Sequence, residues 1–219
     1  CPDLDAAVSA AIGSIYFNQG ESCNAPSRLF VEASIKDAFL EKALAMIPRY
    51  APGDPLDEDT IMGAIVDETQ MKTVMGYIEA GKAGGARLLA GGEAVRLDSG
   101  GYYVAPTLFD QVDNGMRIAQ EEIFGPVLSV LTFTDVTGEV RQANATPYGL
   151  AAAVWTSDIS KAIKVSRALR AGTVHVNQYD NDDITVPFGG VKQSGNGRDK
   201  SLHAFDKYTE LKTTWIQIG

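Results

Sequence analysis

Cys23 is the residue best placed for chemistry in this sequence, because it lies in a short polar stretch between two apolar segments. Gly20 allows a sharp backbone turn before it, and the small or polar neighbours Ser22 and Asn24 leave room for a substrate. Backbone N–H groups in this stretch are able to stabilise a developing oxyanion. A buried structural cysteine usually has apolar neighbours. The setting therefore favours a nucleophilic thiol that attacks a carbonyl carbon.

Other candidate groups are few. The sequence has two histidines, His175 in a strand-like run and His203 in a helix-like one, and neither stands beside Cys23. We therefore interpret both as packing or surface residues, and we expect no zinc site from two histidines and one internal cysteine. The pair Glu121 and Glu122 precedes Phe124. By itself this pattern is typical of a solvated acidic pair before a core aromatic residue.

Composition limits the possible partners and compartments. The 219 residues include 19 Lys and Arg against 28 Asp and Glu, which gives a net charge of −9. Clustered basic residues are needed to bind nucleic acid or an anionic membrane, so we expect neither partner. There is no apolar run of about 18 residues that would span a membrane. Two cysteines, one of them terminal, form no disulfide framework, which favours a reducing, cytoplasmic compartment.

The spacing of apolar residues predicts the elements that position these groups. We expect helices over residues 4–17, 34–47, 67–83, 138–144 and 160–169, with Ser34 capping the second helix. Strands are predicted over residues 28–31, 87–90, 102–104, 127–133, 151–155 and 173–176. The alternation of both kinds predicts an α/β fold with a mostly parallel sheet flanked by helices on both faces. Residues 211–218 alternate as an exposed or pairing strand would.

Six short motifs resemble those of the aldehyde dehydrogenase superfamily, in family order and over the whole chain. They are NQGESC at 18–23, PTLF at 106–109, EEIFGPV at 121–127, YGLAA at 148–152, GTVHVN at 172–177 and PFGGVKQSGNGR at 187–198. Two positions depart from the usual pattern: Glu21 stands where Gln is commoner, and Pro26 where Gly is commoner. Residues 183–218 look most similar to the gamma-glutamyl-aminobutyraldehyde dehydrogenase branch.

The resemblance implies roles for several residues. Cys23 falls on the nucleophile, which would form a thiohemiacetal and then a thioester with an aldehyde substrate. Glu122 matches the residue that accepts hydrogen bonds from the nicotinamide ribose of NAD or NADP, and Phe124 matches the aromatic residue beside the nicotinamide. Gln70 resembles a secondary cofactor contact, although a polar residue on a helix face is often only solvated.

The resemblance also implies a substrate pocket. Its expected lining residues are Phe17, Ser22, Asn24, Asp182 and Phe188, with the loop 178–188 at its mouth. Asp182 replaces an aromatic residue that is common in enzymes for simple apolar aldehydes, and Asp180 and Asp183 lie beside it. Carboxylates at the mouth would attract a substrate with a cationic far end, such as an ω-amino or gamma-glutamylamino aldehyde. A merely solvated acidic loop is the alternative.

The chain resembles the C-terminal, catalytic half of such an enzyme. We expect a catalytic domain at 1–206 and an oligomerisation segment at 207–219, whose strand 211–218 would join a homodimer or homotetramer. The nucleotide-binding domain, the general base and an oxyanion-hole asparagine would lie upstream, so these residues alone would be inactive. A thiol hydrolase or esterase remains an alternative, as does a non-catalytic assembly fragment.

Overall fold

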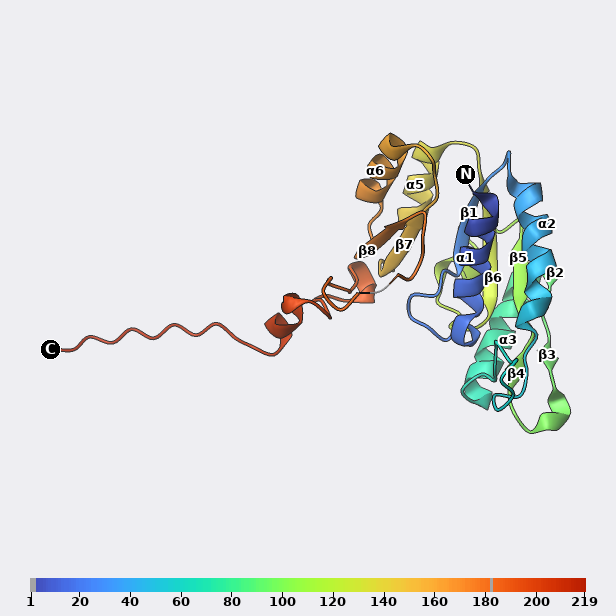
Figure 1. The fold of residues 1–219 in the computed structure, drawn as a ribbon, viewed down its shortest axis with the longest axis horizontal. Helices are drawn as coiled ribbons and strands as arrows, with labels where there is room; N and C mark the ends of the chain where they lie inside the picture. Colours follow the sequence, from blue (N-terminus) through green and yellow to red (C-terminus); the bar gives the residue numbers. More distant parts are fainter. Residues whose placement is uncertain (1–2, 182) are drawn as a thin grey trace.

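The computed structural model describes residues 3–181 and 183–219 (Figure 1). Its α-helices are α1 (Leu4–Tyr16), α2 (Lys36–Met46), α3 (Glu68–Ala83), α4 (Arg117–Gln120), α5 (Val136–Asn144) and α6 (Ile159–Ala168). Its strands are β1 (Arg28–Glu32), β2 (Arg87–Ala90), β3 (Ala94–Val95), β4 (Tyr103–Val104), β5 (Thr107–Asp110), β6 (Val127–Phe133), β7 (Ala151–Val154) and β8 (Thr173–Val176). Short 3-10 turns follow α1 at Phe17–Gly20 and α2 at Ile47–Tyr50, and others are Leu97–Ser99, Lys192–Ser194 and Leu202–Lys207.

The strands of the described residues form three sheets instead of the one sheet that the sequence predicted. The largest has the order β1-β6-β5-β2, in which β1, β6 and β5 run parallel and β2 runs antiparallel to β5. Strands β7 and β8 pair in parallel as a second sheet, and β3 and β4 form a short antiparallel pair. The predicted α/β class with mostly parallel pairing is confirmed.

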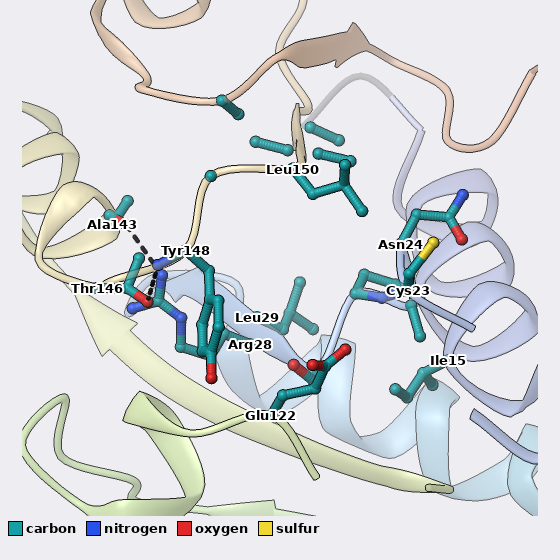
Figure 2. A pocket seen from close by; sticks show the side chains of 18 of the residues that line it. Ile15, Cys23, Asn24, Arg28, Leu29, Glu122, Ala143, Thr146, Tyr148 and Leu150 are labelled. Atoms are coloured by element: carbon teal, nitrogen blue, oxygen red, sulfur yellow. Dashed lines mark hydrogen bonds between the residues drawn. The ribbon is translucent and has the colours of Figure 1, made fainter. Parts of the chain in front are cut away.

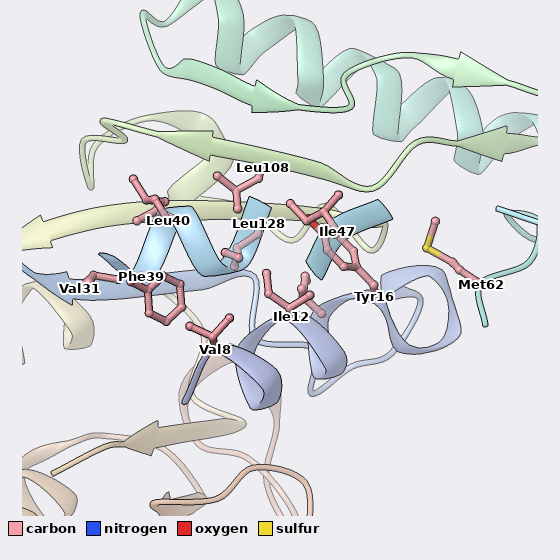
Figure 3. Close-up of a cluster of buried hydrophobic side chains, with 13 residues drawn as sticks. Val8, Ile12, Tyr16, Val31, Phe39, Leu40, Ile47, Met62, Leu108 and Leu128 are labelled. Atoms are coloured by element: carbon pink, nitrogen blue, oxygen red, sulfur yellow. The ribbon is translucent and has the colours of Figure 1, made fainter. Parts of the chain in front are cut away.

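Helices cover both faces of the largest sheet, as predicted. Alternate residues of β6 point to opposite faces, so Leu128 and Val130 join one buried cluster while Val127 and Leu131 join another. The first cluster packs under α1 and α2, with side chains such as Ile12 and Phe39 (Figure 3). The second cluster packs under α3 and α4, and its largest members from the helices are Tyr77, Ile78 and Ile118.

Local chemistry explains where the helices nearest the site begin. The Asp3 carboxylate accepts a hydrogen bond from the Ala6 N–H at 2.9 Å, which caps α1. The Asp67 carboxylate caps α3 in the same way, at 2.8 Å from the Gln70 nitrogen. The predicted cap of α2 is wrong: that helix starts at Lys36 after Ile35, and the Ser34 hydroxyl donates instead to Glu32 at 3.2 Å.

The end of the chain extends away from the rest of the molecule (Figure 1). Residues 209–219 have no helix or strand, and Leu211, Trp215 and Ile218 are exposed. The strand predicted at 211–218 is therefore not formed within this single chain, where no described strand lies beside it for pairing. Its pairing with another subunit stays a prediction.

Candidate active site

The segment that carries Cys23 starts with an unusual backbone turn. Asn18, Gln19 and Gly20 all have positive φ, at 47°, 58° and 72°. This conformation stops α1 and carries the chain across to β1, and it is strained for the two residues that have side chains. Gly20 lies against a second loop, because a Cβ placed there would be only 2.2 Å from the carbonyl oxygen of Gly125. The 18–27 segment, which we term the nucleophile loop, is therefore in direct contact with the EEIFGPV motif.

Two side chains of the nucleophile loop attach it to residues 63–66. The Gln19 side-chain oxygen accepts a hydrogen bond from the Gly63 N–H at 3.1 Å, and the Glu21 carboxylate accepts from the Val66 N–H at 3.1 and 3.2 Å. Burial raises the pKa of Glu21, against hydrogen bonds from Val66 and Gln19 that lower it. The position that departs from the usual family pattern thus serves to hold the loop in place.

The two glutamates of the EEIFGPV motif have different surroundings. Glu121 accepts hydrogen bonds from the Tyr77 hydroxyl at 2.8 Å and from Arg117 at 2.9 Å, and these contacts lower its pKa. Glu122 is exposed, and it lines the same cavity as Cys23 (Figure 2). The expectation of a purely solvated pair therefore fails for Glu121, and Glu122 is the carboxylate that is open to a ligand.

Gln70 supports the same motif from α3. Its side-chain nitrogen donates to the backbone oxygens of Ile123 at 3.1 Å and Phe124 at 2.7 Å. Phe124 has a φ of 53° and is 38% exposed, so this amide holds a strained backbone with its aromatic ring outward. A direct contact between Gln70 and a cofactor remains a prediction.

One cavity of about 510 Å³ joins the expected thiol and cofactor groups. Of the residues predicted from the sequence, it is lined by Ser22, Cys23, Asn24, Glu122 and Phe124. The size is in the usual range for small-molecule sites.

Other predicted site residues lie elsewhere or are not described. Phe17 is 62% exposed, and neither Phe17 nor Phe188 lines this cavity. The ring of Phe188 lies under the ammonium of Lys200, 5.4 Å from its centroid. Asp182 lies outside the described residues.

The backbone around Cys23 offers hydrogen-bond donors. Over residues 3–181 and 183–219, no protein acceptor is found for the N–H of Cys23 or for that of Asn24. Cys23 itself is a free and exposed thiol. An oxyanion that forms at a carbon bonded to this sulfur has two open donors close by.

Sequence reasoning missed Arg28 and did not single out Tyr179 within the loop 178–188, and both residues line the cavity. The Tyr179 hydroxyl donates to the backbone oxygen of Asn24, and burial raises its pKa well above the usual range. Arg28 is half-buried; it donates to Asn114 at 2.8 Å, and it donates to the Ala143 oxygen at 2.9 Å (Figure 2). A charged residue in a strand run was the one signal for Arg28. Tyr179 lies in the loop 178–188 that was expected at the pocket mouth, but its bond to Asn24 had no signal because the two residues are 155 positions apart.

Two further features bear on the chemistry. Within the described part of the chain, no three His, Cys, Asp or Glu side chains come together as metal ligands would. No helix among the described residues is long and apolar enough to cross a membrane.

Comparison with known proteins identifies the family. The model of the aldehyde dehydrogenase family matches residues 1–214. The chain belongs to the aldehyde dehydrogenase family. Among curated relatives, the NADP/NAD-dependent aldehyde dehydrogenase PuuC of Escherichia coli is 48% identical over 218 residues, which cover 100% of this chain and 43% of PuuC. The chain therefore spans less than half the length of this relative.

Solved structures of family members superpose closely on the chain. The indole-3-acetaldehyde dehydrogenase AldA of P. syringae, in complex with NAD+ and IAA, has a TM-score of 0.96 at 62% identity, over 99% of this chain and 44% of that one. The gamma-glutamyl-gamma-aminobutyraldehyde dehydrogenase of Burkholderia cenocepacia has a TM-score of 0.94 at 60% identity, over 98% and 43%. The family and the fold that the motifs predicted are confirmed.

Proposed function

We propose that this chain is the thiol-bearing part of an NAD(P)-dependent aldehyde dehydrogenase that oxidises an aldehyde to a carboxylic acid. The observation that carries the proposal is the shared cavity: the Cys23 thiol, two open N–H donors and the Glu122 carboxylate all border it. A nucleophilic thiol, donors to the oxyanion and an acceptor for the cofactor ribose are among the groups that covalent aldehyde oxidation uses. Membership of the family supports the same activity.

The chemistry begins at Cys23. Its thiolate forms a bond to the aldehyde carbon while the carbonyl π electrons move to oxygen, and the N–H groups of Cys23 and Asn24 stabilise that oxyanion. A nicotinamide cofactor, when bound, accepts the hydride that leaves this carbon. The oxyanion electrons then return to the carbon and a thioester remains on Cys23. Water adds to the thioester carbon, the C–S bond breaks, and the carboxylic acid and the Cys23 thiolate are released while one proton passes to solvent.

The EEIFGPV motif fits the nicotinamide end of the cofactor. Glu122 is exposed and lines the cavity, and its carboxylate suits the two hydroxyls of a ribose. Phe124 presents a partly exposed ring at the same place, held there by Gln70. Relatives named as NADP/NAD-dependent or solved with NAD+ support this assignment.

We further propose an aldehyde with a polar or cationic far end, such as an ω-amino or gamma-glutamylamino aldehyde. Support comes from the acidic loop and from the 60% identity to the Burkholderia cenocepacia enzyme. Within that loop, the Asp183 carboxylate is used locally, because it accepts from the N–H and the hydroxyl of Thr185 at 2.8 Å each. Asp182 remains the residue proposed for charge recognition.

The exposed C-terminal tail supports a proposal of oligomerisation. Apolar side chains such as Leu211 and Trp215 are more than 90% exposed, and such exposure marks interaction sites. Residues 211–218 would then add as a strand to a sheet of another subunit in a homodimer or homotetramer. The free thiol of Cys23 fits a reducing, cytoplasmic setting.

Replacement of the thiol tests the proposal directly. In the full-length enzyme, Cys23→Ala should remove aldehyde oxidation while the unfolding midpoint stays that of the wild type, because Cys23 is exposed and packs against no core. Steady-state turnover with an aldehyde panel and both cofactors provides the measurement. Near-normal turnover by Cys23→Ala would refute the role of this thiol.

A further inference from the structure

We infer that Asn24 is a positioning residue that fastens the nucleophile loop to the 177–180 segment and so fixes the direction of the Cys23 thiol. The inference rests on the proposed function and adds to it a role for two loop residues. Asn24 follows the nucleophile directly. Its side-chain oxygen, its side-chain nitrogen and its backbone oxygen each take part in a hydrogen bond. Two of these hydrogen bonds join Asn24 to residues that lie 155 and 156 positions further along the sequence.

Three hydrogen bonds meet at Asn24. The Ser22 hydroxyl donates to the Asn24 side-chain oxygen at 2.6 Å, which closes a bridge across the intervening Cys23. The Asn24 side-chain nitrogen donates to the Asp180 carboxylate at 2.5 Å. The Tyr179 hydroxyl donates to the Asn24 backbone oxygen. We term these three contacts the Asn24 clasp.

The far side of the clasp is itself fixed to the second sheet. Asn177, which follows β8, accepts from the Thr156 N–H at 2.8 Å and donates to the Thr156 oxygen at 2.9 Å. Asn177 and Asp180 both have positive φ, at 53° and 59°, so the short segment between them has a defined, strained path. Cys23 is therefore attached through Asn24 to the β7–β8 sheet, in addition to its attachment to residues 63–66 through Gln19 and Glu21.

The clasp assigns a different role to Asp180 from that of a charge detector. Its carboxylate is occupied by the Asn24 amide, and a charge-assisted bond of this kind is among the stronger ones. Asp180 would thus act as a hydrogen-bond acceptor that orients the loop, and substrate charge would be recognised elsewhere. This distinction makes the inference testable, because asparagine keeps an acceptor oxygen at that position and removes the charge.

The test uses the full-length enzyme with one neutral and one amino-terminated aldehyde. Asn24→Ala should lower kcat/KM for both aldehydes equally, by about tenfold or more, because small misplacements of a nucleophile are costly. Asp180→Ala should do the same, whereas Asp180→Asn should stay within about threefold of the wild type. The double alanine variant should be no worse than either single one, as expected for one shared interaction. The Kd for NAD should not change.

The matched control is Asn196→Ala, which removes the same amide from an exposed turn. Near wild-type kcat/KM for Asn24→Ala would overturn the inference, as would a loss in Asp180→Asn confined to the amino-terminated aldehyde. The rate of Cys23 alkylation by iodoacetamide, measured without aldehyde or cofactor, tests the clasp independently of turnover. Asn24→Ala should change that rate while Asn196→Ala does not. A wild-type enzyme that oxidises no aldehyde would refute the proposed function and leave the alkylation result to decide the clasp.

Discussion

Replacement of Gly20 by alanine should damage both the stability of the chain and the placement of Cys23. Gly20 has a φ of 72°, and its missing side chain leaves room for the backbone of Gly125. A Cβ at this position would be 2.2 Å from the Gly125 oxygen and 2.4 Å from its carbonyl carbon. These neighbours are backbone atoms, so no side-chain rotation can relieve the contact.

The magnitude follows from two separate costs. A left-handed conformation costs a residue with a side chain roughly 1–2 kcal/mol relative to glycine. Overpacking against a fixed neighbour adds about 1–3 kcal/mol, so Gly20→Ala should lower the free energy of unfolding by about 2–5 kcal/mol. Relief of the overlap requires the nucleophile loop and the EEIFGPV loop to separate by about 1 Å, and a shift of that size can lower turnover roughly a hundredfold.

Gly100→Ala separates the two costs. Gly100 has a similar φ of 79°, yet nothing lies within 4 Å of the position that its Cβ would take. Denaturant unfolding should therefore show only the backbone cost of about 1–2 kcal/mol for Gly100→Ala. In the full-length enzyme, kcat/KM should fall for Gly20→Ala alone. Equal destabilisation of the two variants with full activity of Gly20→Ala would refute the close packing of these loops.

Three other outcomes are expected. The Asp110 side chain is 1% exposed and contacts Lys36 at 2.6 Å and Arg87 at 2.9 Å; burial alone would raise its pKa, but these partners hold it below the ordinary value. The stabilisation of the folded state by the ionised Asp110 carboxylate is present above the unfolded-state pKa and is lost as pH falls through the folded-state pKa. Asp110→Asn should therefore lower the free energy of unfolding by about 3 kcal/mol at pH 7 and by progressively less below pH ~4. Denaturant unfolding at a series of pH values provides the measurement. The 219-residue chain alone should bind NAD with a Kd weaker than micromolar, because none of the site residues assigned to it is a helix N-terminus that would bind the pyrophosphate. Calorimetry that finds micromolar affinity would contradict this. Asp182→Phe in the full-length enzyme should lower kcat/KM for an aminoaldehyde several-fold, because a partly exposed charge pair is worth about 1 kcal/mol, and it should raise kcat/KM for an aliphatic aldehyde. Equal responses of the two substrates would show that the acidic loop is only solvated and does not recognise substrate charge.

Local patterns in the sequence were sufficient to predict most helices and strands. The apolar spacing of α1 and α3 and the buried run of β6 each depend on one segment facing one core, so periodicity alone locates them. The division of the strands into three sheets depends on which edges pair, and pairing joins distant segments that carry no local signal. The cap of α2 was misplaced because a backbone turn, in which the Ile35 N–H donates to the Glu32 oxygen, makes Ile35 the N-cap residue, one position after Ser34.

The site shows the same division between local and distant information. Motifs identified Cys23, Glu122 and Phe124, which the structure brings to one cavity. The partners that hold these residues lie far away in the sequence: Gln70 reaches the EEIFGPV loop, and Asp180 reaches Asn24. Their amide and carboxylate groups are common on protein surfaces, so only the folded geometry distinguishes them from solvated residues.

The exposed C-terminal tail carries one of the two tryptophans of the chain, and this gives the molecule two separable fluorescent reporters. Trp215 is 93% exposed, so its emission should be that of an indole in water and should shift to shorter wavelength if the tail becomes covered by another subunit. Trp155 is partly buried and lines the cavity, so its emission should respond to a ligand there. A Trp155→Phe variant would isolate the tail signal, and assembly could then be followed against protein concentration without any attached dye.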